Sequence, residues 1–383
     1  MTRSLGCRAL LVAAVAATWT ANAWSQAQSA PTPAGEPYVY THWESFTSAS
    51  THGALTNDHI FFLEPDGDSL WIGTENGLVL YYHGTWRSWT EADGLPWRVV
   101  MSIAKDHKTG DLWLALFGGG IARFSGGRFE SYTQMNSGLV NDVAYGIDTQ
   151  GDNVWVATTA GISRYDYVRD EWRTFNEYNA PMEEIWAYNA STSDDGRKVY
   201  VAVWGGGILE WDVATETWKD YTDPDEEMEI DLYRDDGLIH IITTSASSKD
   251  GVLWAGTYFG LSRYDGRSWR GYLDKDSGLP SNFINQTVGR TGTSCYNGTD
   301  KGLAVLADTA SDTWVTYQRD TENAATWTAH VKVGPNEVRA VPTDLDLPNH
   351  FVISVAFMGN DVWIGTGHGL AHGIGTGYYE GIR

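Results

Sequence analysis

The stretch LWIGTENGL at Leu70–Leu78 decides the fold, because VWIGTGHGL returns at Val362–Leu370, near the other end of the chain. In both stretches an apolar residue and an aromatic residue are followed by a small residue and, further on, by a glycine and another apolar residue. Internal repeats of this kind indicate one structural unit that is used many times. Five more copies begin at Leu112, Val154, Val199, Leu253 and Cys295. The sequence therefore contains seven copies of one unit.

A second motif follows the first six copies and pairs two aromatic residues across two others. It begins at Trp86, Phe129, Trp172, Trp218, Trp269 and Trp314, with a spacing of 43 to 51 residues along the chain. The seventh copy is missing after Val362–Leu370 and occurs instead as WESFT at Trp43, before the first repeat. A strand moved to the opposite end of the chain can close a ring and leave no open sheet edge.

Each repeat also contains about four short β-rich runs separated by Gly, Asp and Asn turns, as in a four-stranded blade. We therefore predict an all-β protein, a seven-bladed β-propeller with four-stranded blades and an N-terminal strand that closes the last blade. We expect the tryptophans to fill the space between blades, each stabilising the fold by roughly 2–3 kcal/mol. The repeated glycine, such as Gly77, should adopt the positive φ of a tight hairpin. Helix content should be near zero.

The first thirty residues have the layout of a secretory signal peptide. Arg3 and Arg8 precede an apolar run over Ala9–Ala17, and small residues follow at Ala21–Ala23. The apolar run is too short to span a bilayer. We predict a signal peptide and leader over 1–30, a flexible linker over 31–37 and a single propeller over 38–383. The protein should be exported, to the periplasm or the cell exterior, without membrane insertion.

Charge and cysteine content restrict the possible functions. Loss of Arg3 and Arg8 would change the formal charge from −23 to −25, which argues against nucleic acid and anionic lipid as partners. Cys295 would then be the only cysteine, so an intramolecular disulfide and a cysteine-based zinc or haem motif are excluded. A chain of this length can be held together by core packing alone.

The repeats resemble a known family. The pattern LWIGT-x-x-GL, the motif W-x-x-Y/W-T and the turns DGLP at Asp93–Pro96 and SGLP at Ser277–Pro280 are similar to the two-component-regulator propeller repeat. The resemblance covers essentially the whole mature chain. In that family such propellers form periplasmic sensor domains of hybrid kinases and sometimes stand alone. Nothing after Trp363 resembles a membrane helix, a kinase or a DNA-binding domain. The resemblance therefore implies the fold and ligand binding, without kinase activity.

A binding site is expected on the face where the connections between blades and the middle turn of each blade emerge, which we call the top face. Propellers commonly bind ligands there, at the mouth of the central channel. The residues that begin the innermost strands and the middle turns, Phe117 and Tyr258 among them, supply the candidates. The ligand-binding candidates are Glu184, His240, His350, Asp58, Asp142, Trp97, Arg98, Trp204 and His368.

Two interpretations of these residues remain open. Two histidines and several carboxylates can bind a divalent metal ion or perform acid–base chemistry. Alternatively, Asn and Asp recur at these positions, as in Asn57, Asn141 and Asn349, because their side chains hydrogen-bond to turn backbone. His240 and His350 break the repeat, and for them the two interpretations are about equally favoured.

Two insertions interrupt the repeat in connections of the top face, at 223–236 and 318–346. The first is rich in carboxylates and is predicted to be a solvated loop, with calcium binding as the less favoured interpretation. In the second, Trp327, Ala329 and Val331 alternate with polar residues, which predicts an amphipathic β-hairpin. We expect it to cover the top of the propeller as a lid; the alternative is contact with another protein or an identical subunit.

The favoured function is an exported ligand-binding or protein-interaction propeller that uses the channel mouth to bind a small ligand, a glycan or a protein partner. The alternative is a metal-assisted lyase or hydrolase that uses Glu184, His240 and His350. No Gly-x-Ser-x-Gly motif, His-Glu-x-x-His motif or phosphate loop supports catalysis, and no residue is predicted to be catalytic. Because fold alone does not choose between the two, the test is whether those three side chains meet.

Overall fold

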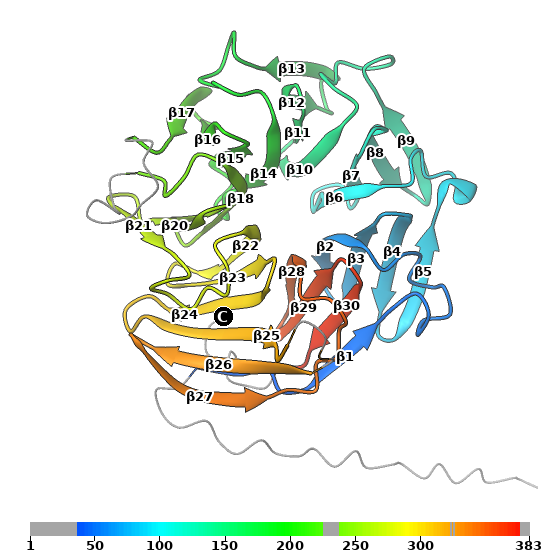
Figure 1. Ribbon diagram of the computed structural model, residues 1–383. Coiled ribbons are helices and arrows are strands. Elements are labelled where there is room, and N and C mark those ends of the chain that lie inside the picture. The colour runs from blue at the N-terminus through cyan, green and yellow to red at the C-terminus, as the bar shows by residue number, and fades with distance from the viewer. Residues whose placement is uncertain (1–36, 225–236, 322–323, 325, 376–383) are drawn as a thin grey trace, which may run out of the picture. The chain divides into compact units, whose positions relative to one another are not determined.

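The structure of the protein is a computed structural model that describes residues 37–224, 237–321, 324 and 326–375. The predicted signal peptide and residues 225–236 of the acidic insertion lie outside the described residues. The unit that begins at Pro37 contains seven antiparallel sheets arranged in a ring around a central axis (Figure 1). The predicted seven-bladed β-propeller is confirmed. Glu91–Asp93, a 3-10 turn, is the only helical element in the described part of the chain.

Each blade is a meander whose first strand lies nearest the axis. The first three blades are β2–β5 (Ile60–Asp66, Ser69–Thr74, Gly77–Tyr82, Thr85–Trp89), β6–β9 (Val100–Lys105, Leu112–Leu116, Gly120–Ser125, Arg128–Tyr132) and β10–β13 (Ala144–Gln150, Asn153–Thr158, Gly161–Asp166, Glu171–Phe175). The next two are β14–β17 (Ala187–Thr192, Lys198–Val203, Gly207–Asp212, Thr217–Tyr221) and β18–β21 (Thr243–Lys249, Val252–Thr257, Gly260–Tyr264, Trp269–Tyr272).

The last two blades differ from the others. The sixth contains β22–β27 (Ile284–Thr291, Ser294–Thr299, Gly302–Asp308, Thr313–Arg319, Trp327–Val333, Asn336–Pro342). The seventh contains β28–β30 (Val352–Met358, Asp361–Thr366, Gly369–Gly373) and takes its outer strand, β1 (Trp43–Phe46), from the N-terminus. Strand β1 pairs antiparallel with β30, and Trp43 lies opposite Gly373. This pairing confirms the predicted closure of the ring.

The repeated tryptophans and glycines have the roles that were expected of them. Trp155 in the third blade is buried and lies 5.6 Å, between ring centroids, from Trp211 in the fourth, so the pair fills the space between two sheets. Gly77 has a φ of 127°, and a Cβ at this position would lie 2.6 Å from the carbonyl oxygen of Trp89. A side chain there would clash with the outer strand of the same blade.

The hairpin of the second insertion does not cover the top face, and the predicted lid is wrong. Strand β26 pairs along its whole length with β25, and β27 pairs with β26, so the hairpin extends the sixth blade to six strands. The apolar residues Trp327, Ala329 and Val331 are fully buried. An exposed hairpin is marginal alone, and edge-to-edge pairing satisfies both its backbone and its apolar face.

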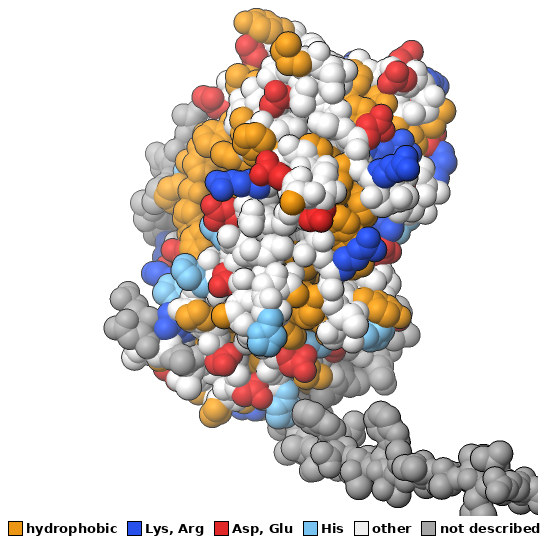
Figure 2. Space-filling view, turned by 90° about the vertical axis from the view of Figure 1, so that its right-hand side faces the viewer, with side chains coloured by type: hydrophobic (Ala, Val, Ile, Leu, Met, Phe, Trp, Pro, Cys, Tyr) orange, Lys and Arg blue, Asp and Glu red, His pale blue; other side chains and the backbone are white. Residues whose placement is uncertain are grey.

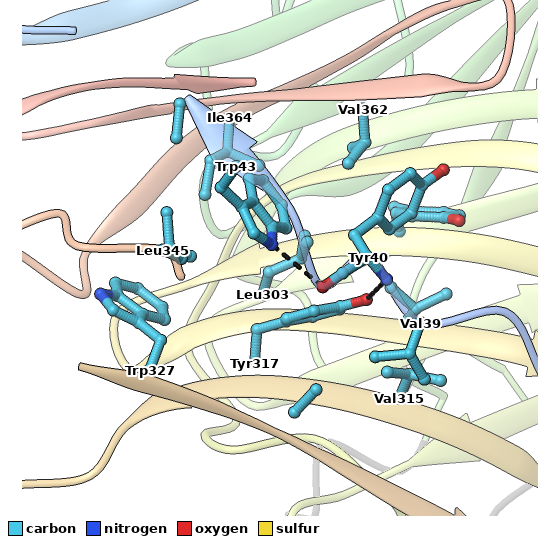
Figure 3. Packing of buried hydrophobic residues seen from close by; sticks show 14 of the residues in the cluster. Val39, Tyr40, Trp43, Leu303, Val315, Tyr317, Trp327, Leu345, Val362 and Ile364 are labelled. Carbon is cyan, nitrogen blue, oxygen red and sulfur yellow. Dashed lines mark hydrogen bonds between the residues drawn. The ribbon is translucent and has the colours of Figure 1, made fainter. Parts of the chain in front are cut away.

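Strand β25, on which the hairpin packs, and the connection that follows the hairpin hold the strand that closes the ring. Tyr40 donates its backbone N–H to the Tyr317 hydroxyl at 2.8 Å, and the Trp43 indole stands against Tyr317 with ring centroids 5.6 Å apart (Figure 3). The Asp344 carboxylate accepts the backbone N–H of Trp43 at 2.6 Å and lies 3.2 Å from His42. We call this group of contacts the closure clamp.

Every junction between neighbouring blades is bridged by a side chain of one innermost strand that accepts a backbone N–H from the next. The acceptors, from the first blade onward, are Glu64, Ser102, Asp148, Asn189, Ser245, Gln286 and Ser354. Five of these acceptors occupy the same position, directly after the bulge of the innermost strand. In the first and third blades this position holds Phe62 and Gly146, whose side chains offer no acceptor. In these two blades the carboxylates Glu64 and Asp148, two residues further along the strand, accept the N–H instead.

Candidate functional site

All seven innermost strands have a β-bulge at the same place. The bulge leaves one residue of each strand outside the pairing with its neighbour: Phe61, Met101, Tyr145, Tyr188, Thr244, Asn285 and Ile353. Bulges redirect a side chain and are common next to binding sites. All seven of these residues line one cavity at the centre of the ring, and we call them the bulge ring.

The cavity has a volume of about 190 Å³ and is lined by residues of every blade. Its other lining residues include His59, Ser102, Asn189, Tyr258 and Phe351. No Asp, Glu, Lys or Arg lines it within the described part of the chain. Burial lowers the pKa of His59, so this ring is uncharged at neutral pH. The cavity therefore combines aromatic surface with neutral polar groups.

Aromatic rings form a continuous arc around the mouth of this cavity. We call the following residues the aromatic belt: Phe117, Tyr145, Trp186, Tyr188, Trp204, Tyr258, Phe283 and Phe351. Trp186 stacks on Trp204 at 5.5 Å between centroids, and Tyr258 meets Trp204 edge-on at 4.5 Å. The belt crosses six blades. Its rings are partly exposed, so a ligand can contact them.

Three tyrosines of the belt come from successive blades and direct polar groups into the cavity. Burial raises the pKa values of Tyr145, Tyr188 and Tyr258, and Tyr258 and Tyr145 raise that of Tyr188 further. Groups influence each other in this way only when they are close together, because charge interactions fall with distance. The three phenols stay protonated at neutral pH and can donate or accept hydrogen bonds.

His240 stabilises a turn. Its Nδ1 accepts the backbone N–H of Ile242 at 3.0 Å, which fixes the turn before β18. Asn57, Asn141 and Asn349 accept the N–H two residues further on in the same way, at 2.7, 2.7 and 2.6 Å. The His240 ring stacks on Phe259 with centroids 4.1 Å apart, and burial lowers its pKa. In a neutral ring whose Nδ1 accepts a hydrogen bond, Nε2 carries the proton. Neither nitrogen of His240 then has a free lone pair for a metal ion.

The carboxylates Asp58 and Asp142 are also used inside the chain. Asp58 accepts the backbone N–H of Ser48 at 2.5 Å, and Asp142 accepts that of Gln134 at 2.7 Å. Each carboxylate thus ties the connection that precedes it to the start of an innermost strand. These bonds are of the turn-stabilising kind that the alternative interpretation expected.

Glu184, His240 and His350 do not share a site. His350 lies in a separate hollow with Lys301 and Arg319, whereas exposed Glu184 lies beside the turn at Gly205. Across residues 37–375, apart from the undescribed gaps, no group of three His, Cys, Asp or Glu side chains could hold a metal ion. The constellation on which the enzyme alternative depended is not formed.

The remaining candidates lie on the top face with different surroundings. Trp97 is 40% exposed and packs against the glycines of the FGGG turn, where a Cβ on Gly119 would lie 2.3 Å from its own Cβ. Arg98 is exposed. His368 is exposed, and its Nδ1 lies 3.0 Å from the amide nitrogen of Asn349. Of the nine predicted ligand-binding residues, Trp204 belongs to the aromatic belt, together with Phe117 and Tyr258 of the other middle turns named at the predicted site.

Most of the belt and all of the bulge ring were not predicted from the sequence. Tyr145, Trp186, Tyr188 and Phe351 lie two to four residues beyond the predicted rim, at the start of innermost strands. Aromatic residues there look like core residues, because a regular strand would turn alternate side chains toward neighbouring blades. The detectable signal was the excess of aromatics, as in IWAYNA at Ile185–Ala190, at positions where the other repeats are small or aliphatic.

Comparison with solved structures gives the fold a context. Over 87% of its length the chain is similar to the extracellular domain of BT4673 from B. thetaiotaomicron, assigned to a hybrid two-component system, with 16% identity and a TM-score of 0.62. The corresponding domain of BT3049 from the same organism matches over 82% of the chain, with 16% identity and a TM-score of 0.58. The chain spans about two fifths of both neighbours, 40% in each case.

A further similar structure, virginiamycin B lyase from Staphylococcus aureus, matches over 86% of this chain and 98% of its own, with 13% identity and a TM-score of 0.57. These likenesses show the propeller fold and agree with the predicted resemblance to two-component-regulator propellers. No protein-family model and no curated protein matches the sequence. In the described residues, no helix has the length and apolar character needed to cross a membrane.

Proposed function

We propose that this protein is an exported ligand-binding propeller that captures a small molecule at the mouth of its central channel. The observation that carries the proposal is that all seven innermost strands have a bulge at the same place and that all seven bulge residues line one cavity. Bulges are common next to binding sites, where they redirect a side chain. Partly exposed aromatic rings at the cavity add a stacking surface.

Export is part of the same proposal. It rests on the signal-peptide pattern of residues 1–30 and on fold neighbours described as extracellular domains. Expression of the full chain in a bacterial host, followed by fractionation and N-terminal sequencing, tests it. We expect a product outside the cytoplasm whose N-terminus lies after residue 20. An uncleaved protein confined to the cytoplasm would refute export.

A thermal-shift screen against neutral and charged metabolites and oligosaccharides tests ligand binding. A ligand present at 100 times its Kd adds about 2.7 kcal/mol to the free energy of unfolding, which raises the Tm measurably. The shift should disappear in Tyr188→Leu, which removes a ring of the belt, and persist in Tyr82→Leu. Tyr82, at the end of β4, is 49% exposed and does not line the cavity. Equal shifts in both variants would place the ligand elsewhere.

A protein partner on the top face is a second candidate, favoured by two exposed apolar side chains. Met135 and Tyr178 are 92% and 86% exposed and occupy equivalent positions on neighbouring connections. A partner that binds the top face can bury both side chains. Cross-linking in the native host compares wild type with the double variant Met135→Ser, Tyr178→Ser. Loss of the same cross-linked band in the double variant supports this candidate, and an unchanged pattern removes it.

A further inference from the structure

We propose that the channel mouth binds a small organic cation, such as a quaternary ammonium compound, held against the aromatic belt by cation–π contacts. This inference rests on the proposed ligand-binding function and names the chemistry of the ligand. Three features of the mouth carry it: partly exposed aromatic rings with no cationic side chain over them, a cavity without fixed charge, and acidic surroundings.

The belt differs in what covers its rings from the aromatic clusters at most junctions between blades, although the cluster of Phe46, Tyr81 and Trp86 also has no Lys or Arg of the described chain over it. Between the blades, cationic side chains of the chain lie over aromatic faces: Arg263 is 5.5 Å from the centroid of Trp254, and Lys219 is 4.3 Å from that of Tyr221. Among the described residues, no Lys or Arg is recorded over a ring of the belt. Neighbouring belt rings stack on one another, as Trp186 does on Trp204, and the parts of their faces that stay exposed can contact a cation from outside.

The cavity itself selects against anions. It is lined by aromatic rings, hydroxyls and amides, and an anion that entered it would lose water without meeting a cationic partner. Several of the polar groups are already occupied: Ser245 accepts the N–H of Thr287, and the Asn285 amide donates to the Val352 carbonyl. What remains is mainly π surface and phenol oxygen, both of which stabilise a weakly hydrated cation.

The connections of the top face add a negative field around the mouth. Along 90–99, 133–143, 176–186 and 273–283 the cationic side chains are Arg98 and Lys275. The carboxylates of the same connections are Glu91, Asp93, Asp142, Glu177, Glu183, Glu184, Asp274 and Asp276. On the outer side shown in Figure 2, by contrast, acidic and basic side chains are interspersed. A field of one sign around an opening raises the local concentration of the opposite ion.

Isothermal titration with choline and with its uncharged isostere 3,3-dimethylbutan-1-ol tests the inference on the full mature chain. We expect choline to bind at least about tenfold more tightly than the alcohol, since the two differ only in charge. Raising NaCl from 50 to 500 mM should weaken choline severalfold and leave the alcohol unchanged. Tyr188→Leu should weaken choline at least about tenfold, and Tyr188→Phe, which keeps the ring face, less than about threefold.

Tyr82→Leu is the matched control, since Tyr82 of β4 is 49% exposed and does not line the cavity. It should bind choline like the wild type, and a thermal melt of each variant checks that it folds. The inference is overturned if the alcohol binds as tightly as choline, if choline shows no binding at millimolar concentration, or if Tyr188→Leu has no effect. None of these results touches the proposed function. That function fails separately, when no neutral or charged compound in the thermal-shift screen gives a shift that depends on Tyr188.

Discussion

At the scale of single residues, His240 shows how one physical task can be met by different side chains. Its Nδ1 accepts the N–H of Ile242 as Asn57 accepts that of His59. We therefore expect His240→Asn to keep the free energy of unfolding within about 0.5 kcal/mol of wild type, and His240→Ala to lose about 1 kcal/mol. Urea unfolding at pH 7 measures both. A loss in His240→Asn as large as in His240→Ala would show that the imidazole has another role.

Glu64 and Asp148 are the two residues whose charge should matter most for stability. Burial, with a contribution from Asp148, raises the pKa of Glu64 to about 8, and burial raises that of Asp148 to about 6. A carboxyl whose pKa is raised by folding binds its proton more tightly in the folded state. The contribution of Glu64 to the free energy of unfolding is therefore fully present below the unfolded pKa of about 4.5. It is lost as the pH rises toward 8.

Glu64→Gln should remove this loss, because the amide keeps an acceptor for the Lys105 N–H and never ionises. We expect the variant to match wild type near pH 5 and to be more stable by about 1 to 3 kcal/mol near pH 9. Chemical unfolding from pH 5 to 9 measures the difference. Glu171→Gln, on an exposed strand position, is the control and should follow the wild-type curve. A constant offset at all pH values would contradict the assignment.

At the scale of elements, the closure clamp should set the stability of β1. Asp344 accepts the backbone N–H of Trp43, and a charge-assisted bond of this kind contributes about 1.5 to 3 kcal/mol. Asp344→Ala should therefore speed hydrogen exchange in β1 and β30 and leave the innermost strands protected. Asp346→Ala, an exposed neighbour in the same connection, serves as the control. Exchange that rises equally in all blades would mean that Asp344 stabilises the whole ring and not one strand.

At the scale of the whole molecule, the ring depends on a strand that is far from its partner in sequence. A chain that begins at Ser48 would leave β30 with an unpaired edge and leave the cluster around Tyr317 open. We expect a lower Tm and concentration-dependent aggregation, because open edges pair with other chains. A synthetic peptide covering 37–47, added in trans, should restore the Tm. A shortened chain as stable as the full one would show that the last blade does not need β1.

The sequence was sufficient for the ring because its periodic signal is repeated seven times and the displaced motif at Trp43 fixes the closure. The hairpin at Trp327 was misplaced for a physical reason. Alternation shows that a strand has one apolar face, but it does not show which surface that face will cover. The candidate site was missed for a similar reason. A bulge changes the direction of one side chain, but it leaves no signature in the sequence that distinguishes the bulged strand from a regular one.

The bulge ring has a consequence for how this molecule can change over generations. Because Met101 and Ile353 lie outside the register of their ladders, their side chains can be replaced while the strand pairing around them is kept. Thr244 and Asn285 are constrained further, since their side chains hydrogen-bond to carbonyls of neighbouring strands. Selection can therefore act on several of the seven positions without changing the blades. New selectivity could then be acquired by single substitutions, while the scaffold that presents them stays the same.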